Sequence, residues 1–137
     1  MNLTLIDAGP IFAYFCADDH WHQKMREFLE TFKGQFVTTA PVITEVMWLL
    51  GTKTAVQNEL LSDIAKELYI IEPLIPQDFA RIKELNTKYS DVKADFADLS
   101  LITISERLGL EKIVSFDGDF DIYRGLRNKS FKRIFPR

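Results

Sequence analysis

The segment Ala94–Ser105 constrains this chain most, because its pattern predicts a buried helix that also carries two aspartates. The apolar residues that cover almost every side of this helix are Ala97, Leu101, Ile104 and Leu108 on one stripe, with Phe96, Leu99 and Ile102 on the others. A helix with this pattern is normally buried. We therefore expect the rest of the chain to be organised around it.

The two aspartates of this helix have different explanations. Asp95 and Asp98 both fall in its first turn, where the helix dipole favours negative charge, and this suffices for Asp95. Asp98 stands one turn before Leu101 and Ile102, and an aspartate is almost never fully buried without a partner. Because perturbed carboxylates cluster at functional sites, we interpret Asp98 as a candidate site residue.

The length and composition indicate one globular domain that spans residues 1–137. Apolar residues make up 47% of the chain, yet no apolar run approaches the roughly 20 residues that a membrane span needs. The N-terminus lacks the basic start of a secretory signal and is predicted to form a strand. The single cysteine, Cys16, excludes an internal disulfide. We expect a cytoplasmic protein with no membrane contact.

Basic residues are concentrated at the C-terminal end. Between position 124 and the end there is no acidic residue, and the basic ones are Arg124, Arg127, Lys129, Lys132, Arg133 and Arg137. The net charge is −3 overall and +6 in this segment, which leaves −9 for the rest. A basic segment on an acidic body suggests phosphate contacts next to an acidic centre, and a solvated terminal patch is the alternative.

Short apolar runs alternate with segments of helical periodicity along the whole chain. The runs predict strands at Leu3–Ile6, Phe36–Thr38, Tyr69–Ile71, Lys112–Ser115 and, at an edge of the sheet, Lys132–Phe135. This order predicts an α/β fold, a three-layer sandwich in which helices flank a mainly parallel sheet of about five strands.

Four carboxylates are predicted to meet at one end of that sheet. Asp7 ends the first strand and Asp117 follows the fourth. Glu45 lies near the start of a helix whose apolar stripe is Val42, Val46, Leu49 and Leu50. Because Glu45 falls on that stripe, we expect it to face inward. Asp98 lies in the first turn of another helix. Ligand sites of such sheets lie outside the carboxyl ends of the strands.

Carboxylates this close together cannot all stay ionised without a countercharge. A group of hard oxygen ligands without histidine or cysteine suits Mg²⁺ or Mn²⁺ better than Zn²⁺. Such an ion can lower the pKa of a water for attack on a phosphodiester, and a second ion can stabilise the leaving oxygen. The pattern does not distinguish a site for one metal ion from a site for two.

Together, four short motifs resemble those of the PIN domain, and in particular of the VapC-like toxin ribonucleases of toxin–antitoxin pairs. They are Asp7-Ala8-Gly9-Pro10-Ile11, Thr44-Glu45-Val46, Ala97-Asp98-Leu99-Ser100-Leu101 and Val114-Ser115-Phe116-Asp117-Gly118-Asp119-Phe120. The resemblance covers essentially the whole chain in the right order. It implies a PIN-like fold and a metal-dependent endoribonuclease that cleaves RNA.

The resemblance also implies roles for individual residues. Asp7 and Asp98 would hold the principal metal, Glu45 would help to hold it or orient the attacking water, and Asp117 would complete the site or hold a second ion. Possible extra acids are Asp91, Asp95 and Asp119, where the simpler interpretations are a helix N-cap for Asp91 and a first-turn acid for Asp95. Residues proposed to track the RNA backbone are Arg124, Arg127 and Lys129.

Partners follow from the same resemblance, which implies a homodimer and a small antitoxin that inserts a segment near the site. Candidate anchors for that antitoxin, on the early helices, are Phe12, Phe15, Met47 and Trp48.

One position departs from the family pattern. Many members carry a hydroxyl residue two positions after the first aspartate, where this chain has Gly9. The supporting hydrogen bond to the site must then come from the backbone, from Thr44 or from Ser115, or be missing.

Several other functions share part of this pattern. A catalytically weak or inactive PIN-like protein that only binds RNA or serves as a scaffold would be expected to lack one of the main acids, and none is missing. An RNA-maturation nuclease without an antitoxin would share all of these motifs. A phosphoaspartyl hydrolase would need a second aspartate where Gly9 stands, and a receiver domain would need an acidic pair at Asp7.

Overall fold

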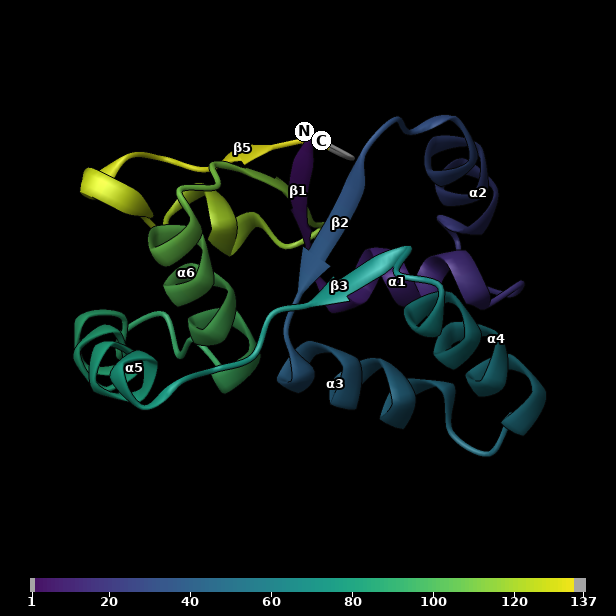
Figure 1. Ribbon diagram of the computed structural model, residues 1–137, viewed down its shortest axis with the longest axis horizontal. Coiled ribbons are helices and arrows are strands. Elements are labelled where there is room, and N and C mark those ends of the chain that lie inside the picture. The colour runs from purple at the N-terminus through teal and green to yellow at the C-terminus, as the bar shows by residue number, and fades with distance from the viewer. Residues whose placement is uncertain (1, 135–137) are drawn as a thin grey trace.

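A five-stranded parallel sheet forms the middle of the computed structural model, which describes residues 2–134. The strands lie in the order β3-β2-β1-β4-β5, and their bounds are β1 Leu3–Ile6, β2 Gln35–Thr38, β3 Tyr69–Ile71, β4 Lys112–Val114 and β5 Lys132–Arg133. All four neighbouring pairs are parallel. The predicted α/β sandwich is confirmed, and β5 is an edge strand as expected (Figure 1). The predicted end of that strand, Phe135, lies outside the described residues.

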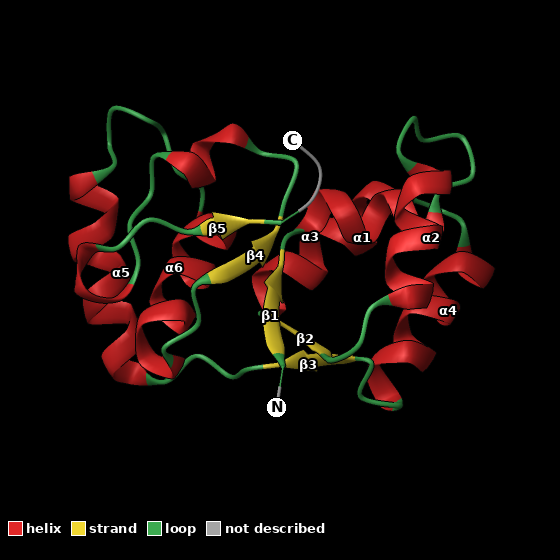
Figure 2. Ribbon diagram, turned by 90° about the horizontal axis from the view of Figure 1, so that it is seen from above, coloured by secondary structure: helices red, strands yellow, loops and turns green. Residues whose placement is uncertain are grey.

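Helices cover both faces of the sheet (Figures 1 and 2). On one side lie α1 (Ala8–Phe15), α2 (His22–Thr31), α3 (Ala40–Leu50) and α4 (Thr54–Ala65), and on the other lie α5 (Pro76–Lys88) and α6 (Phe96–Leu108). Two short 3₁₀ helices, η1 (Gly118–Asp121) and η2 (Leu126–Asn128), connect β4 to β5. None of the helices within residues 2–134 is long and apolar enough to cross a membrane.

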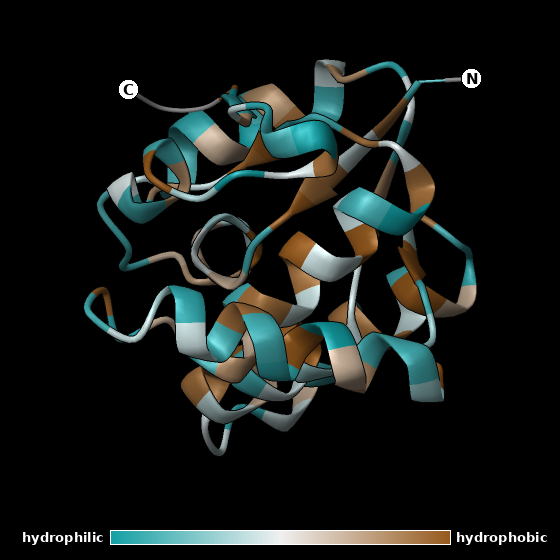
Figure 3. Cartoon of the chain, turned by 90° about the vertical axis from the view of Figure 1, so that its left-hand side faces the viewer, coloured by the Kyte–Doolittle hydropathy of each residue, from teal (hydrophilic) through white to brown (hydrophobic). Residues whose placement is uncertain are grey.

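The strands are apolar on both faces, as a parallel sheet between helices requires. On one face Leu5 lies between its paired neighbours Val37 and Ile113, and on the opposite face Ile6 pairs with Val114. All of these side chains are buried. Figure 3 shows apolar strand segments among helices in which hydrophilic and hydrophobic residues alternate. The sheet therefore forms the core and fixes where the carboxyl ends of the strands lie.

Helix α6 is buried from Ala97 to Ser105, as its pattern predicts. Its three buried hydroxyl side chains donate to main-chain carbonyls of the preceding turn: Ser100 to Ala97, Thr103 to Leu99 and Ser105 to Ile102. These bonds remove the cost of burying polar groups in a helix that has no solvent-facing side there.

Three apolar residues predicted to be buried are exposed instead. Phe96 is the first residue of α6 and stacks on Phe79 of α5 at the surface, with 6.1 Å between ring centroids. Leu108 is the last residue of α6 and extends beyond its buried part. Leu49 is 42% exposed, because the buried side of α3 is the one that carries Val46 and Leu50.

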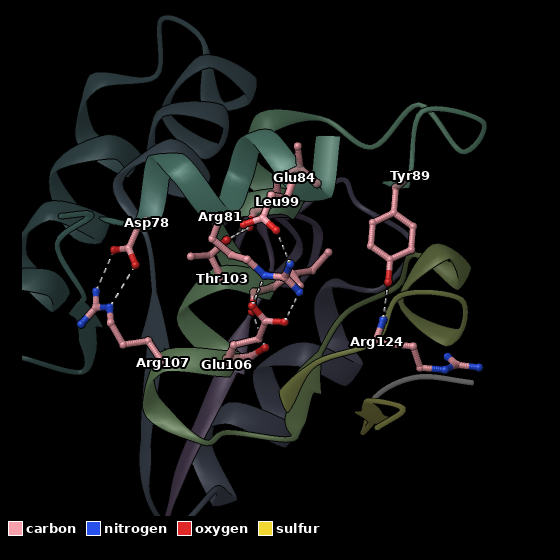
Figure 4. Close-up of polar contacts among 11 residues, drawn as sticks. Asp78, Arg81, Glu84, Tyr89, Leu99, Thr103, Glu106, Arg107 and Arg124 are labelled. Atoms are coloured by element: carbon pink, nitrogen blue, oxygen red, sulfur yellow. Dashed lines mark hydrogen bonds and ion pairs between the residues drawn. The ribbon is translucent and has the colours of Figure 1, made fainter. Parts of the chain in front are cut away.

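An arginine on α6 ties this helix to α5 and to the segment after β3. The guanidinium of Arg107 donates to both carboxylate oxygens of Asp78, at 3.2 and 3.1 Å, and to Glu72 at 2.9 Å (Figure 4). Asp78 is buried and also accepts the main-chain N–H of Ile75 at the start of α5. The ion pair thus compensates a carboxylate that would otherwise be buried without a counterion.

Arg107→Ala is expected to lower the free energy of unfolding by about 2–3 kcal/mol, because Asp78 would keep its charge in a buried position without its partner. The matched control is Glu84→Ala, which removes an exposed i,i+3 pair with Arg81 and should cost less than about 0.5 kcal/mol. Urea unfolding at neutral pH measures both values. Equal small losses in the two variants would contradict this role.

Candidate functional site

The structure brings the four predicted acids together around one pocket of about 320 Å³ at the carboxyl ends of β1 and β4. Asp7 and Asp117 follow these strands, Glu45 comes from α3 and Asp98 from the first turn of α6. The remaining lining residues are Gly9, Asp95 and Phe116. This described lining includes no basic side chain, so the pocket holds negative charge only.

Asp7 is held by two hydrogen bonds at the junction of β1 and α1. Its Oδ1 accepts the main-chain N–H of Ala8 at 2.8 Å, which makes Asp7 the N-cap of α1. Its Oδ2 accepts the hydroxyl of Ser115 at 3.0 Å. Ser115 Oγ also accepts the main-chain N–H of Asp117 at 3.0 Å. One buried serine therefore fixes the relative positions of two acids from different strands.

The structure answers the question that Gly9 raised. Asp7 receives both a main-chain bond and the Ser115 hydroxyl, whereas the Thr44 hydroxyl donates to the carbonyl of Ala40. A Cβ atom at Gly9 would lie 3.2 Å from Cδ2 of the Phe116 ring, which is tighter than usual. A side chain at position 9 would therefore require the Phe116 ring to shift by a few tenths of an ångström.

Asp98 is buried and accepts a hydrogen bond that the sequence did not reveal. The Tyr123 hydroxyl donates to Asp98 Oδ2 at 2.9 Å, and Tyr123 is fully buried against the rings of Tyr89 and Phe120. Tyr123 follows Phe120 at helical spacing, a pattern that indicates core packing only. No sequence signal distinguishes it as a partner of the site.

The three extra acids occupy different positions. Asp95 is the N-cap of α6, where its Oδ1 accepts the main-chain N–H of Asp98, and it also lines the pocket. The N-cap interpretation of Asp91 is wrong, because Asp91 is an exposed turn residue before α6 and Asp95 takes that position. Asp119 donates its main-chain N–H to Asp117 and does not line the pocket, while its neighbour Phe120 is fully buried.

Burial and mutual repulsion raise the pKa of the pocket acids. Burial raises the pKa of Asp98 to about 8, with further increases from the charges of Asp7 and Asp95 and an opposing effect of the Tyr123 hydroxyl. Burial also raises the pKa of Asp7 to about 6, against its bonds from Ala8 and Ser115.

Glu45 follows the same trend from its half-buried position on α3. Burial and the charges of Asp95 and Asp117 raise its pKa. Each shift shows that the pocket disfavours its own negative charge when no cation is present.

The chemistry of the donors fits a hydrated divalent cation. Carboxylate oxygens are the ligands that Mg²⁺ and Mn²⁺ prefer, and the lining offers no other countercharge. Within residues 2–134, no three acidic, histidine or cysteine side chains already stand close enough to hold one metal ion. Because Mg²⁺ keeps several waters and binds one or two carboxylates directly, a ready-made cage of protein ligands is not required.

The three predicted RNA contacts lie on the η1–η2 segment and after it, outside the pocket lining. The Arg124 guanidinium donates to the carbonyls of Asp121, Ile122 and Tyr123, each at 3.0 Å. Its main-chain N–H donates to the Tyr89 hydroxyl (Figure 4).

The other two predicted RNA contacts are exposed. Lys129 Nζ lies 3.7 Å from Glu111, and Arg127 has a left-handed backbone conformation with φ of 56°. Of the three, Arg124 has the most evident structural role, because its guanidinium caps the end of η1.

Comparisons with known proteins agree with this geometry. The sequence profile described as "PIN domain" matches residues 4–126. Ribonuclease VapC26 of Mycobacterium tuberculosis is 24% identical over 115 residues, which are 82% of this chain and 85% of that protein.

Two solved structures share the fold. VapC20 of Mycobacterium tuberculosis, described as a sarcin-ricin loop cleaving toxin, has a TM-score of 0.79 at 16% identity and covers 88% of this chain and 94% of its own. VapBC2 from Rickettsia felis, bound to a DNA fragment from its promoter, has a TM-score of 0.65 at 12% identity and covers 96% and 98%.

The raised pKa values predict how stability depends on pH. Asp7 and Asp98 keep their protons in the folded protein at pH values where the unfolded chain has released them, so the metal-free free energy of unfolding should fall as pH rises from about 4 to about 8. For Asp7 alone, a rise from 3.8 to about 6 corresponds to about 3 kcal/mol.

Asp98→Asn keeps an acceptor for Tyr123 and should flatten this fall, whereas the exposed control Asp91→Asn should retain it. Denaturant unfolding in EDTA at a series of pH values gives the slopes. A slope that is the same in Asp98→Asn as in the parent would refute the assignment.

Ser115→Ala should raise the pKa of Asp7 above about 6, because the carboxylate loses a hydrogen bond that stabilises its charged form. Thr44→Ala is the control, since its hydroxyl donates to the carbonyl of Ala40 instead. NMR titration of the aspartate carboxyl carbons in EDTA reports the value. An unchanged or lowered pKa of Asp7 in Ser115→Ala would rule out the proposed support.

Proposed function

Because the chain belongs to the PIN domain family, we propose that it is a metal-dependent endoribonuclease that cleaves RNA phosphodiester bonds at the acid pocket. The observation that carries the proposal is the arrangement of Asp7, Glu45, Asp98 and Asp117 around one pocket whose lining has no basic residue. The similarity to Ribonuclease VapC26 supports the same class of reaction. A degenerate scaffold is not favoured, because all four acids are present and share this pocket.

Asp7 and Asp98 are the residues that would hold Mg²⁺ or Mn²⁺. Among the described contacts, Tyr123 occupies Oδ2 of Asp98, which leaves Oδ1 for the ion. When bound, such an ion supplies Lewis-acid chemistry: it acidifies a water and neutralises charge on the phosphate. Binding would also release protons from both acids, since their pKa values are raised in the metal-free pocket.

Glu45 and Asp117 complete the set of acids at the pocket, one from α3 and the other from the segment after β4. Glu45 is half-buried and has a raised pKa, so it can orient the attacking water and accept its proton. Asp117 is fixed by Ser115 and by the main-chain N–H of Asp119, and it would complete the ligand set or hold a second ion.

We further propose that the protein acts as the toxin of a toxin–antitoxin pair, as a homodimer that a small antitoxin inhibits. The support is the likeness to VapC26, VapC20 and the VapBC2 complex. Of the predicted antitoxin anchors, Phe12, Phe15 and Met47 are half-buried against the core, and Trp48 is exposed.

Purified protein should cleave single-stranded RNA with Mg²⁺ or Mn²⁺ and lose cleavage in EDTA. Asp7→Asn and Asp98→Asn should each lower the rate at least about 100-fold, because each removes a charge that the reaction requires. Glu59→Gln makes the same change of charge on the exposed side of α4 and should retain activity. Gel analysis of fragments measures all three; cleavage that persists in EDTA or in both aspartate variants would refute the proposal.

A further inference from the structure

In the part of the chain that the structure describes, the two acids proposed to hold the metal ion accept hydrogen bonds from neutral donors. The two oxygens of Asp7 accept the main-chain N–H of Ala8 and the Ser115 hydroxyl. Oδ2 of Asp98 accepts the Tyr123 hydroxyl at 2.9 Å. Among the described contacts Oδ1 of Asp98 accepts none, so the bond from Tyr123 leaves one oxygen of this carboxylate free.

Tyr123 is fixed in a position that keeps this hydrogen bond. Its side chain is fully buried, and its ring lies edge-on to the rings of Tyr89 and Phe120, in each case with 5.0 Å between centroids. The main-chain N–H of the next residue, Arg124, donates to the Tyr89 hydroxyl at 2.8 Å. The Tyr123 hydroxyl therefore cannot turn away from Asp98 without displacing the closely packed side chains around it.

The number of oxygens that a carboxylate offers influences which divalent cation it binds. Ca²⁺ takes about 6–8 oxygen ligands in a flexible geometry and accepts a carboxylate through one oxygen or through both. Mg²⁺ is smaller, demands near-octahedral geometry and combines one or two carboxylates with several waters. A carboxylate with one free oxygen, and with the other held by a buried hydroxyl, therefore suits the smaller ion better.

We propose that Tyr123 is a positioning residue that holds Asp98 with a single free oxygen and thereby makes the pocket select Mg²⁺ over Ca²⁺. This inference rests on the proposed metal-dependent function and specifies which residue determines its choice of ion. Tyr123 acts through the carboxylate, because its hydroxyl donates to Asp98 and its side chain is not part of the pocket lining. Loss of a group that orients a metal ligand typically costs about 10- to 100-fold in metal affinity.

The test is Tyr123→Phe, which removes the hydroxyl and keeps the buried ring. Calorimetric titration of the metal-free protein, without RNA, should show that the dissociation constant for Mg²⁺ rises about 10- to 100-fold, whereas that for Ca²⁺ stays the same or falls. The ratio of the two constants is the decisive quantity, because a change in proton competition at Asp98 would affect both ions alike.

Tyr89→Phe is the matched control. It removes a hydroxyl from the same cluster of buried rings, but that hydroxyl accepts the main-chain N–H of Arg124 instead of donating to Asp98. The ratio of the two dissociation constants should therefore keep its parental value in Tyr89→Phe.

A second measurement needs no substitution. In parent protein that carries ¹³C at the Cζ atoms of its tyrosines, Mg²⁺ should shift the NMR signal of Tyr123, because ion binding at Asp98 draws electron density from the acceptor of its hydroxyl. The signal of Tyr69, the first residue of β3 and hence at the opposite end of the sheet from the acids, should not move.

The outcomes separate this inference from the function on which it rests. A ratio that is unchanged in Tyr123→Phe, or shifted towards Mg²⁺, would overturn the positioning role and leave the metal-dependent nuclease intact. An unshifted Tyr123 signal in parent protein saturated with Mg²⁺ would overturn that role even if the variant did not fold. A parent protein that binds neither Mg²⁺ nor Mn²⁺ would overturn the proposed nuclease and this inference together.

Discussion

Negative charge that is concentrated at the carboxyl ends of β1 and β4 is the constraint on which the site depends. The core fixes these strand ends, since buried residues on β1, β2 and β4 lock the sheet on both faces. The Asp7 side chain cannot turn towards solvent without losing its N-cap hydrogen bond on α1 and its hydrogen bond from Ser115. The acids therefore share one partly buried pocket, and only a cation or protons can relieve their mutual repulsion.

The hydrogen bonds around the pocket hold the carboxylates in place but do not neutralise their charge. Ser115 and Tyr123 are neutral donors, so they orient Asp7 and Asp98 without supplying a positive charge. Two arginines elsewhere in the chain do the opposite. Arg107 neutralises the carboxylate of Asp78 and Arg81 neutralises that of Glu106, and both ion pairs link α5 to α6 (Figure 4). The described pocket lining contains no such partner, which distinguishes the pocket from these structural ion pairs and supports the proposed cation site.

The sequence predicts the parts of this arrangement that periodicity and strand order control. The five strands, the buried α6 and the convergence of Asp7, Glu45, Asp98 and Asp117 all follow from where apolar runs end. Ser115 could be named as a supporting residue because it precedes Asp117 by two positions. Tyr123 could not, because its contact with Asp98 depends on how the irregular segment after β4 folds, which strand order does not determine. The exposure of Leu49 and Phe96 depended likewise on the packing of neighbouring helices.

The close approach of Gly9 and Phe116 has a consequence for how such a chain can change over evolutionary time. Because a Cβ at position 9 would meet the ring at 3.2 Å, a hydroxyl side chain there fits beside a phenylalanine at position 116 only if the ring shifts by a few tenths of an ångström. A smaller residue at 116 removes that contact and makes a later enlargement at position 9 easier. The two positions are therefore sterically coupled, and we expect their replacements to be correlated.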